Sequence, residues 1–195
     1  MGKDIKIDVG LYRFARPLVK LFMKIFYHPK IEGLENISQN EKIILAGIHI
    51  NNLDPFLLIS STKRSIHFLA KKELWSFPTK IIIANMGLIP VDRSIKDSTP
   101  LHVASEYLKQ NGVICIFPEG TTEKGRGILP FKIGAVKLAK ETNTKIVPFV
   151  IKGKYKIFGH NLKIIFGKPI MIKDNDLNKA NNDFQKIIIK MLEAK

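Results

Sequence analysis

The chain has 195 residues, of which 45% are hydrophobic and 25% charged, so it can bury the core of one domain and is too apolar for a disordered protein. Its net charge of +15 favours an anionic partner, which can be a nucleic acid, a phospholipid surface or a phosphorylated substrate. The single cysteine, Cys115, excludes a disulfide within the chain and fits a reducing compartment.

The first predicted element is an amphipathic helix in residues 9–28. Its large apolar side chains recur at helical spacing, and they are Leu11, Phe14, Leu18, Leu21, Phe22, Ile25 and Phe26. Basic residues border this face, which is typical of a helix that lies in a membrane interface. A helix packed on the domain's own core is the alternative. Pro17 is expected to kink this helix or to split it into a helix pair.

Six short runs rich in Ile and Val follow, and they predict strands, several of them buried on both faces. These runs are residues 42–48, 65–70, 87–91, 112–117, 145–151 and 162–167. Helical patterns lie between and after them, at residues 98–112, 129–143 and 181–195. Strands that alternate with helices predict an α/β layered sheet.

The chain lacks the features of a membrane-spanning or secreted protein. No stretch has the 18 or more uninterrupted apolar residues expected of a transmembrane helix, and the N-terminus lacks the apolar core and cleavage site of a secretory signal. We therefore expect the protein in the cytoplasm, either free or on a membrane surface.

The stretch "GIHINNLDPFLL" contains the first candidate pair for proton chemistry, His49 and Asp54. His49 would follow a buried strand, at the edge of the sheet where α/β folds gather their sites. Asp54 followed by Pro55 also has the pattern of a helix N-cap, which is the structural alternative. On an ideal helix the two side chains would point to different faces, but a loop over residues 49–53 can fold His49 back over Asp54.

Two further turns also follow predicted strands. "FPEGTTEKGRG" offers Glu119, Gly120 and Thr121, with the cationic Arg126 close behind, and such a turn can present backbone N–H groups and cations to a phosphate. "GLIPVDRS" offers Arg93, one of five arginines among 32 basic residues, which suits a bidentate contact with phosphate. Taken singly, each turn is equally compatible with a solvated loop. Lys71 follows another strand, where it can either guide an anionic substrate or belong to a solvated face.

Together these stretches resemble a known family. "HINNLD", "GLIPVDR", "FPEGTT" and "IVPFVI", in that order and at these separations, are similar to the four sequence blocks of the glycerophospholipid acyltransferases, especially of those that act on 1-acylglycerol-3-phosphate. The resemblance extends over about residues 43–151 and implies a mixed sheet flanked by helices, in a protein that works at a membrane. Together with the amphipathic helix or helix pair at the N-terminus, this predicts a membrane-associating segment over residues 1–30 and an acyltransferase domain over residues 31–195.

The resemblance also implies roles for individual residues. His49 would be the general base and Asp54 the residue that orients it. Arg93, Glu119 and Gly120 would help to hold the glycerol phosphate, with Thr121, Lys71 and Arg126 as further candidates. Pro148, in the fourth block, would contact the acyl donor or shape the site. Thr122 stands where the family often has Arg, and Lys124 or Arg126 could supply that charge.

The chemistry of acyl transfer agrees with this assignment. A thioester is already activated, so the reaction needs a base for the hydroxyl proton, and a neutral His with an ordinary pKa of about 6.5 suits that task. No cofactor or metal is expected. The expected donor is a thioester of acyl carrier protein or coenzyme A, and the expected acceptor is lysophosphatidic acid, at the cytoplasmic face of an anionic membrane. Another lyso-lipid acceptor is the alternative, and a non-catalytic protein that binds lipid or nucleic acid is a more distant one.

Overall fold

The computed structural model describes residues 10–74, 86–92, 98–121 and 127–194. The N-terminal part contains helix α1 (Gly10–Phe26), strand β1 (Lys30–Glu32), a short 3-10 helix (Leu34–Asn36), strand β2 (Ile43–Gly47), helix α2 (Asp54–Ser61), strand β3 (Ile66–Lys71) and a second 3-10 helix (Lys72–Leu74). The remainder contains β4 (Ile89–Val91), α4 (Thr99–Lys109), β5 (Val113–Ile116), α5 (Gly134–Thr142), β6 (Lys145–Lys152), β7 (Lys163–Phe166) and α6 (Leu177–Glu193).

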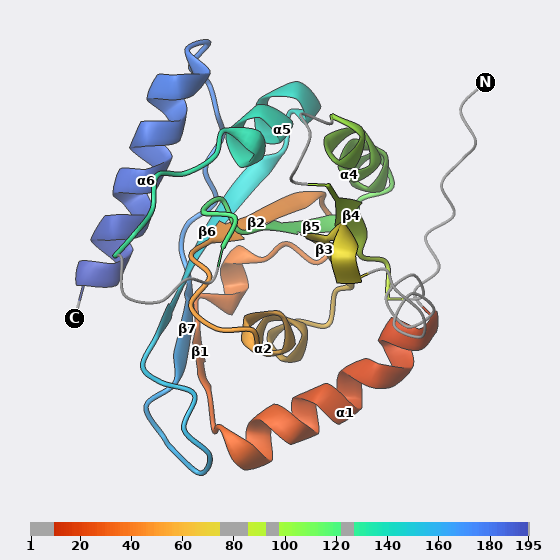
Figure 1. Ribbon diagram of the computed structural model, residues 1–195, viewed down its shortest axis with the longest axis vertical. Helices are drawn as coiled ribbons and strands as arrows, with labels where there is room; N and C mark the ends of the chain where they lie inside the picture. The colour runs from red at the N-terminus through yellow and green to blue at the C-terminus, as the bar shows by residue number, and fades with distance from the viewer. Residues whose placement is uncertain (1–9, 75–85, 93–97, 122–126, 195) are drawn as a thin grey trace.

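The described strands form one seven-stranded sheet in the order β1-β7-β6-β2-β5-β3-β4. Neighbouring strands are parallel except β6 and β7, which pair antiparallel. Helices α1 and α2 lie on one side of the sheet, and α4, α5 and α6 on the other (Figure 1). The predicted mixed sheet flanked by helices is therefore confirmed.

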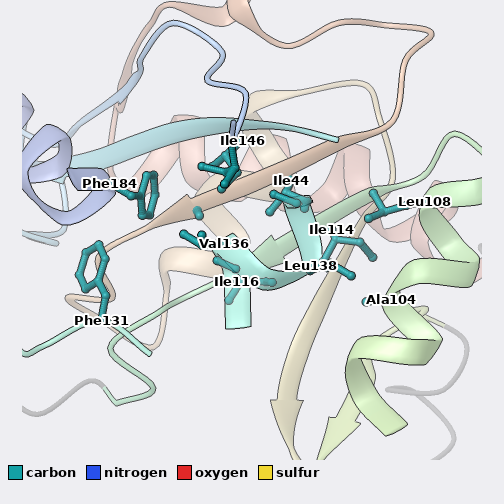
Figure 2. Packing of buried hydrophobic residues seen from close by; sticks show 14 of the residues in the cluster. Ile44, Ala104, Leu108, Ile114, Ile116, Phe131, Val136, Leu138, Ile146 and Phe184 are labelled. Carbon is teal, nitrogen blue, oxygen red and sulfur yellow. The ribbon is translucent and has the colours of Figure 1, made fainter. Parts of the chain in front are cut away.

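Alternating side chains of the central strands build a separate apolar core on each face of the sheet. In β2, Ile44 and Ala46 belong to the core under α4, α5 and α6, whereas Ile43 and Leu45 belong to the core over α1 and α2. Figure 2 shows the first core, where Phe131 and Phe184 face each other with ring centroids 5.7 Å apart. Burial on both faces explains why these strands consist of almost continuous Ile, Val and Leu.

The six predicted strands are all present, within one or two residues of their expected bounds. Strand β1 was not predicted, because its three residues are exposed and show no apolar pattern. Helix α6 begins at Leu177, earlier than expected, because the side chain of Asp176 accepts hydrogen bonds from the backbone N–H groups of Asn178 and Lys179.

Helix α1 is one continuous element from Gly10 to Phe26, so Pro17 does not split it into a pair of helices. Pro17 lies on the exposed side of the helix, where water can satisfy the backbone carbonyl that its missing N–H leaves unpaired. Tyr12 and Met23 are fully buried and belong to the core that includes α2. The helix thus packs on the domain through these residues, whereas Phe14, Leu18 and Leu21 of its predicted apolar face are exposed. None of the helices in the described ranges is long and apolar enough to cross a membrane.

The sheet and its helices place two loops beside each other at one edge. Strands β2 and β5 are parallel neighbours, with Ala46 beside Ile116. The chain leaves β2 toward α2 on one side of the sheet and leaves β5 toward α5 on the other (Figure 1). Such a reversal opens a crevice at the carboxyl ends of the strands, where α/β folds bind their ligands.

His67 of β3 is an unusual polar residue in the core. It is 2% exposed, its Nδ1 lies 2.9 Å from the carbonyl oxygen of Gly87, and its ring meets that of Tyr107 edge-on. A Cβ added to Gly87, whose φ is +68°, would lie 2.5 Å from Nδ1, so only glycine fits there. Burial lowers the pKa of His67 to about 4, and the hydrogen bond to Gly87 opposes that shift in part.

This burial predicts a loss of stability in mild acid. The unfolded chain, with an ordinary His pKa of about 6.5, binds more protons than the folded chain between that pH and about 4. The stabilising effect of neutral His67 is therefore complete above pH 6.5 and declines toward pH 4, by roughly 3 kcal/mol in total. We expect His67→Gln to show a shallower decline in the free energy of unfolding over this range, measured by denaturant titration at each pH. Equal slopes for the two proteins would contradict the prediction.

Candidate active site

The site is built on the loop between β2 and α2. Strand β2 ends at Gly47 and helix α2 begins at Asp54, so His49 lies just beyond the strand and Asp54 in the first turn of the helix. The intervening loop turns back on itself, because the backbone N–H of Asp54 donates to the carbonyl of Asn51 and that of Leu53 donates to the Asn51 side chain. This fold brings the two predicted residues together, as the expected loop required.

The carboxylate of Asp54 is completely buried and fully engaged. Its Oδ2 lies 2.8 Å from Nδ1 of His49 and also accepts the backbone N–H groups of Ile50, at 2.7 Å, and Asn51, at 2.9 Å. Its Oδ1 accepts the hydroxyl of Tyr155 at 2.7 Å. A buried carboxylate with this many donors is stable in its charged form, since hydrogen bonds replace the water that it lost.

Asp54 does not act as the helix N-cap. Leu53 holds the N-cap position, with no side-chain capping bond, and Pro55 follows in the first turn. The Asp54 side chain instead points back over the preceding loop, to the N–H groups of Ile50 and Asn51. Those two N–H groups are consequently not available to stabilise a negatively charged intermediate.

The imidazole of His49 is held on two sides. Its Nδ1 faces Asp54, so the proton on this nitrogen is the one donated to the carboxylate, and Nε2 is left as the basic nitrogen. One ring face stacks on Phe117, with centroids 4.0 Å apart and planes 16° apart. The side chain is 18% exposed, so a substrate can reach it. In the described residues no hydrogen bond to Nε2 is present.

Glu119 connects the loops that follow β2 and β5. Its Oε1 accepts the backbone N–H of His49 at 3.3 Å, and its Oε2 accepts that of Leu129 at 3.2 Å. The carboxylate thus fixes the His49 backbone from the neighbouring loop. Gly120 follows with φ +71°, and the Nζ of Lys132 lies 2.9 Å from the position that a Cβ would occupy there, so a cation lies beside this turn. Thr121 is half-buried next to it.

The other predicted site residues lie around this centre. Lys71 is exposed at the end of β3, on the sheet edge that carries His49. Pro148 is buried within β6 beside Ala46, and its link to the site runs through the next residue, Phe149, whose ring contacts that of Phe117. Arg93, Thr122 and Arg126 lie outside the described residues.

Two residues of the site were not predicted, Phe117 and Tyr155. Phe117 begins the "FPEG" turn, but the sequence pattern is equally compatible with a core residue at this position. Tyr155 stands in a Lys-rich stretch 101 residues after Asp54, with no motif around it. Cys115 is fully buried below the site, where burial, and then the charge of Asp54, raise the pKa of its thiol well above the ordinary range. It therefore packs as a neutral side chain.

In chemical terms, the arrangement is an oriented base. A buried carboxylate fixes the imidazole and stabilises its protonated form, and the other ring nitrogen is accessible, as in hydrolase triads. The described residues contain no cluster of His, Cys, Asp and Glu side chains that could hold a metal ion. The site can thus accept a proton from a hydroxyl that approaches Nε2.

Comparison with known proteins identifies the family to which the chain is similar. A family model described as Acyltransferase matches residues 28–152. The chain is 33% identical over 145 residues to the 1-acyl-sn-glycerol-3-phosphate acyltransferase of Borreliella burgdorferi, covering 73% of this chain and 57% of that protein. It is 27% identical over 168 residues to the protein of the same name from Bacillus subtilis, covering 82% of each.

A solved structure has the same fold. The crystal structure of the 1-acyl-sn-glycerophosphate acyltransferase from Thermotoga maritima superposes with a TM-score of 0.75 at 21% identity, covering 94% of this chain and 82% of that one. The chain spans about half the length of several curated relatives that it matches, such as 49% of a chloroplastic 1-acyl-sn-glycerol-3-phosphate acyltransferase of Arabidopsis thaliana, to which it is 32% identical over 177 residues and 81% of its own length.

The position of Glu119 predicts a structural effect of its replacement. Glu119→Gln leaves one acceptor oxygen for two backbone N–H groups, so one of them loses its partner. We expect the free energy of unfolding to fall by about 1–3 kcal/mol, measured by denaturant titration. The matched control is Glu41→Gln, because Glu41 forms an exposed ion pair with Lys145, and such pairs contribute little. Equal effects of the two changes would contradict this role of Glu119.

Proposed function

The chain belongs to the acyltransferase family, and on that premise we propose that it transfers a fatty acyl group from a thioester to the sn-2 hydroxyl of 1-acylglycerol-3-phosphate, which yields phosphatidic acid. The observation that carries the proposal is the contact between Nδ1 of His49 and the buried carboxylate of Asp54, 2.8 Å apart. The names of the relatives support the acceptor, since they refer to 1-acyl-sn-glycerol-3-phosphate.

The proposed reaction uses the two ring nitrogens of His49 for different purposes. Nε2 takes the proton of the acceptor hydroxyl while its oxygen bonds to the thioester carbonyl carbon. Nδ1–H stays bonded to Asp54, whose charge stabilises the imidazolium. The carbon–sulfur bond then breaks, and the thiolate that leaves takes the proton back from Nε2. The product is an ester and a free thiol, and His49 is again neutral.

The phosphate of the acceptor requires cations near His49. We propose that Lys71, on the same edge of the sheet, belongs to this set together with Arg93 and Arg126, and that Gly120 and Thr121 contribute from the turn after β5. Glu119 supports the site by fixing the His49 backbone. The donor thioester is that of acyl carrier protein or coenzyme A, and no further cofactor takes part.

The proposal predicts that turnover depends on His49. We expect wild-type protein with lysophosphatidic acid and an acyl thioester to release thiol and form phosphatidic acid, identified by mass, with acyl carrier protein or coenzyme A as the carrier. His49→Ala should lower the rate by about 10²–10⁴-fold, the usual contribution of a general base. The control is His102→Ala, which removes an imidazole from α4, on the face of the sheet opposite α2.

Each outcome of this assay is informative. Turnover that survives His49→Ala would refute the mechanism. Thioester consumption with a different lyso-lipid only, measured with a panel of headgroups, would keep the chemistry and change the acceptor. Retention on vesicles without any thioester consumption would indicate a binding protein.

We further propose that the protein works on the cytoplasmic face of an anionic membrane. Five apolar residues of α1 face away from the domain and are 42–71% exposed, namely Phe14, Leu18, Leu21, Phe22 and Ile25. We call this set the apolar surface of α1. Exposed Arg13, Lys20 and Lys24 flank it, which suits the headgroups of anionic lipid, while Tyr12 and Met23 hold the helix on the domain.

Removal of apolar area from this surface should weaken membrane binding. We expect Leu18→Ser with Leu21→Ser to reduce binding to vesicles that contain phosphatidic acid by at least about tenfold, since each buried Leu contributes on the order of 1.5–3 kcal/mol. Sedimentation with the vesicles measures this. Met171→Ser is the control, because Met171 is also exposed, between β7 and α6, outside the apolar surface of α1. Equal binding of the wild type and the double variant would contradict the proposal.

A further inference from the structure

The hydroxyl of Tyr155 holds the one oxygen of Asp54 that the His49 loop does not engage. Oδ2 receives His49, Ile50 and Asn51, all from the loop that precedes the helix. Oδ1 receives the Tyr155 hydroxyl at 2.7 Å, from the segment between β6 and β7. Because the Asp54 side chain is completely buried, water cannot easily replace this donor.

Tyr155 is suited to act as a permanent donor. Burial, followed by the charge of Asp54, raises the pKa of its phenol far above the ordinary value, so the hydroxyl keeps its proton at any physiological pH. Its ring packs edge-on against Tyr27, with centroids 5.7 Å apart, which fixes where the hydroxyl lies. Tyr27 is itself buried, directly after α1.

The segment that carries Tyr155 is anchored independently of the site. Phe158 donates its backbone N–H to the carbonyl of Phe26, the last residue of α1, at 2.6 Å, and the two rings lie 5.8 Å apart. The position of Tyr155 is therefore set by α1 and by the strands β6 and β7, and not by the loop of His49.

We propose that Tyr155 is a positioning residue, which fixes the Asp54 carboxylate and limits its basicity so that His49 stays neutral at the pH of catalysis. This inference rests on the proposed function. A carboxylate that accepts a hydrogen bond at Oδ1 has less electron density for Nδ1–H at Oδ2. Loss of the phenol makes the carboxylate a stronger partner for the imidazolium, and His49 then holds its proton up to a higher pH.

Other groups near the pair do not supply this effect. The Cys115 thiol lies buried below Asp54 and is neutral. The carboxylate of Glu119 accepts the backbone N–H of His49. The amine of Lys132 lies beside Gly120, the residue after Glu119. Among the described residues, the Tyr155 hydroxyl is the side-chain donor to Oδ1.

The test compares Tyr155→Phe with Tyr27→Phe. The first removes the hydroxyl bonded to Asp54, and the second removes a hydroxyl from the ring packed against it, so both keep the aromatic contact. For Tyr155→Phe we expect kcat to fall about tenfold, with KM for the acceptor within twofold, because a positioning residue acts through Asp54 and not on the substrate. The acidic limb of the pH–rate profile should move up by roughly half a unit to one unit. Tyr27→Phe should leave both unchanged.

A second readout needs no turnover. The imidazole of His49 can be titrated by NMR in the full-length chain, with its signal identified by its absence from His49→Ala. We expect its midpoint to lie at higher pH in Tyr155→Phe than in the wild type. A midpoint that stays in place or moves down would overturn the proposal, whatever happens to the rate. If the wild type fails to acylate lysophosphatidic acid, the proposed function fails, and this titration still decides the role of Tyr155.

Discussion

The buried carboxylate of Asp54 is the constraint on which the rest of the site depends. A charge without access to water is tolerated only when hydrogen-bond donors surround it. Here the donors are two backbone N–H groups of the preceding loop, the imidazole of His49 and the hydroxyl of Tyr155. The loop must fold back to supply them, and that conformation directs Nδ1 of His49 to the carboxylate and leaves Nε2 for chemistry.

The sheet makes this convergence possible. Strands β2 and β5 are parallel neighbours whose following helices lie on opposite faces, so their loops meet at one edge without competing for space. The loop after β5 contributes Phe117 against the imidazole and Glu119 against the His49 backbone. Two apolar cores, one on each face of the sheet, hold both strands in register. The cores therefore fix the strand ends from which the two loops of the site begin.

Helix α1 has an exposed apolar side and also contacts the segment that carries Tyr155, the residue bonded to Asp54. One side of the helix is packed on the domain through Tyr12 and Met23, and the other presents the apolar surface of α1. Its C-terminal end contacts Phe158, which belongs to the same segment as Tyr155. Ile157 and Phe158 at this end are also exposed. The apolar side chains that suit lipid contact are thus continuous with the segment that holds Asp54.

The sequence by itself determined the α/β class and six of the seven strands, because these depend on local periodicity. The pairing of His49 with Asp54 was implied by the resemblance of four motifs, in order, to the acyltransferase family, whereas their spacing alone left a helix N-cap as the alternative. Tertiary structure alone decided that the Asp54 side chain points to the preceding loop and does not cap its helix. It likewise decided that Glu119 accepts the backbone N–H of His49 and that Phe117 stacks on the imidazole. It also decided that α1 packs on α2 and that Tyr155 reaches Asp54 across 101 positions of the chain. Such contacts leave no local pattern, because a buried charge selects its donors by their position in space and not by their distance along the chain.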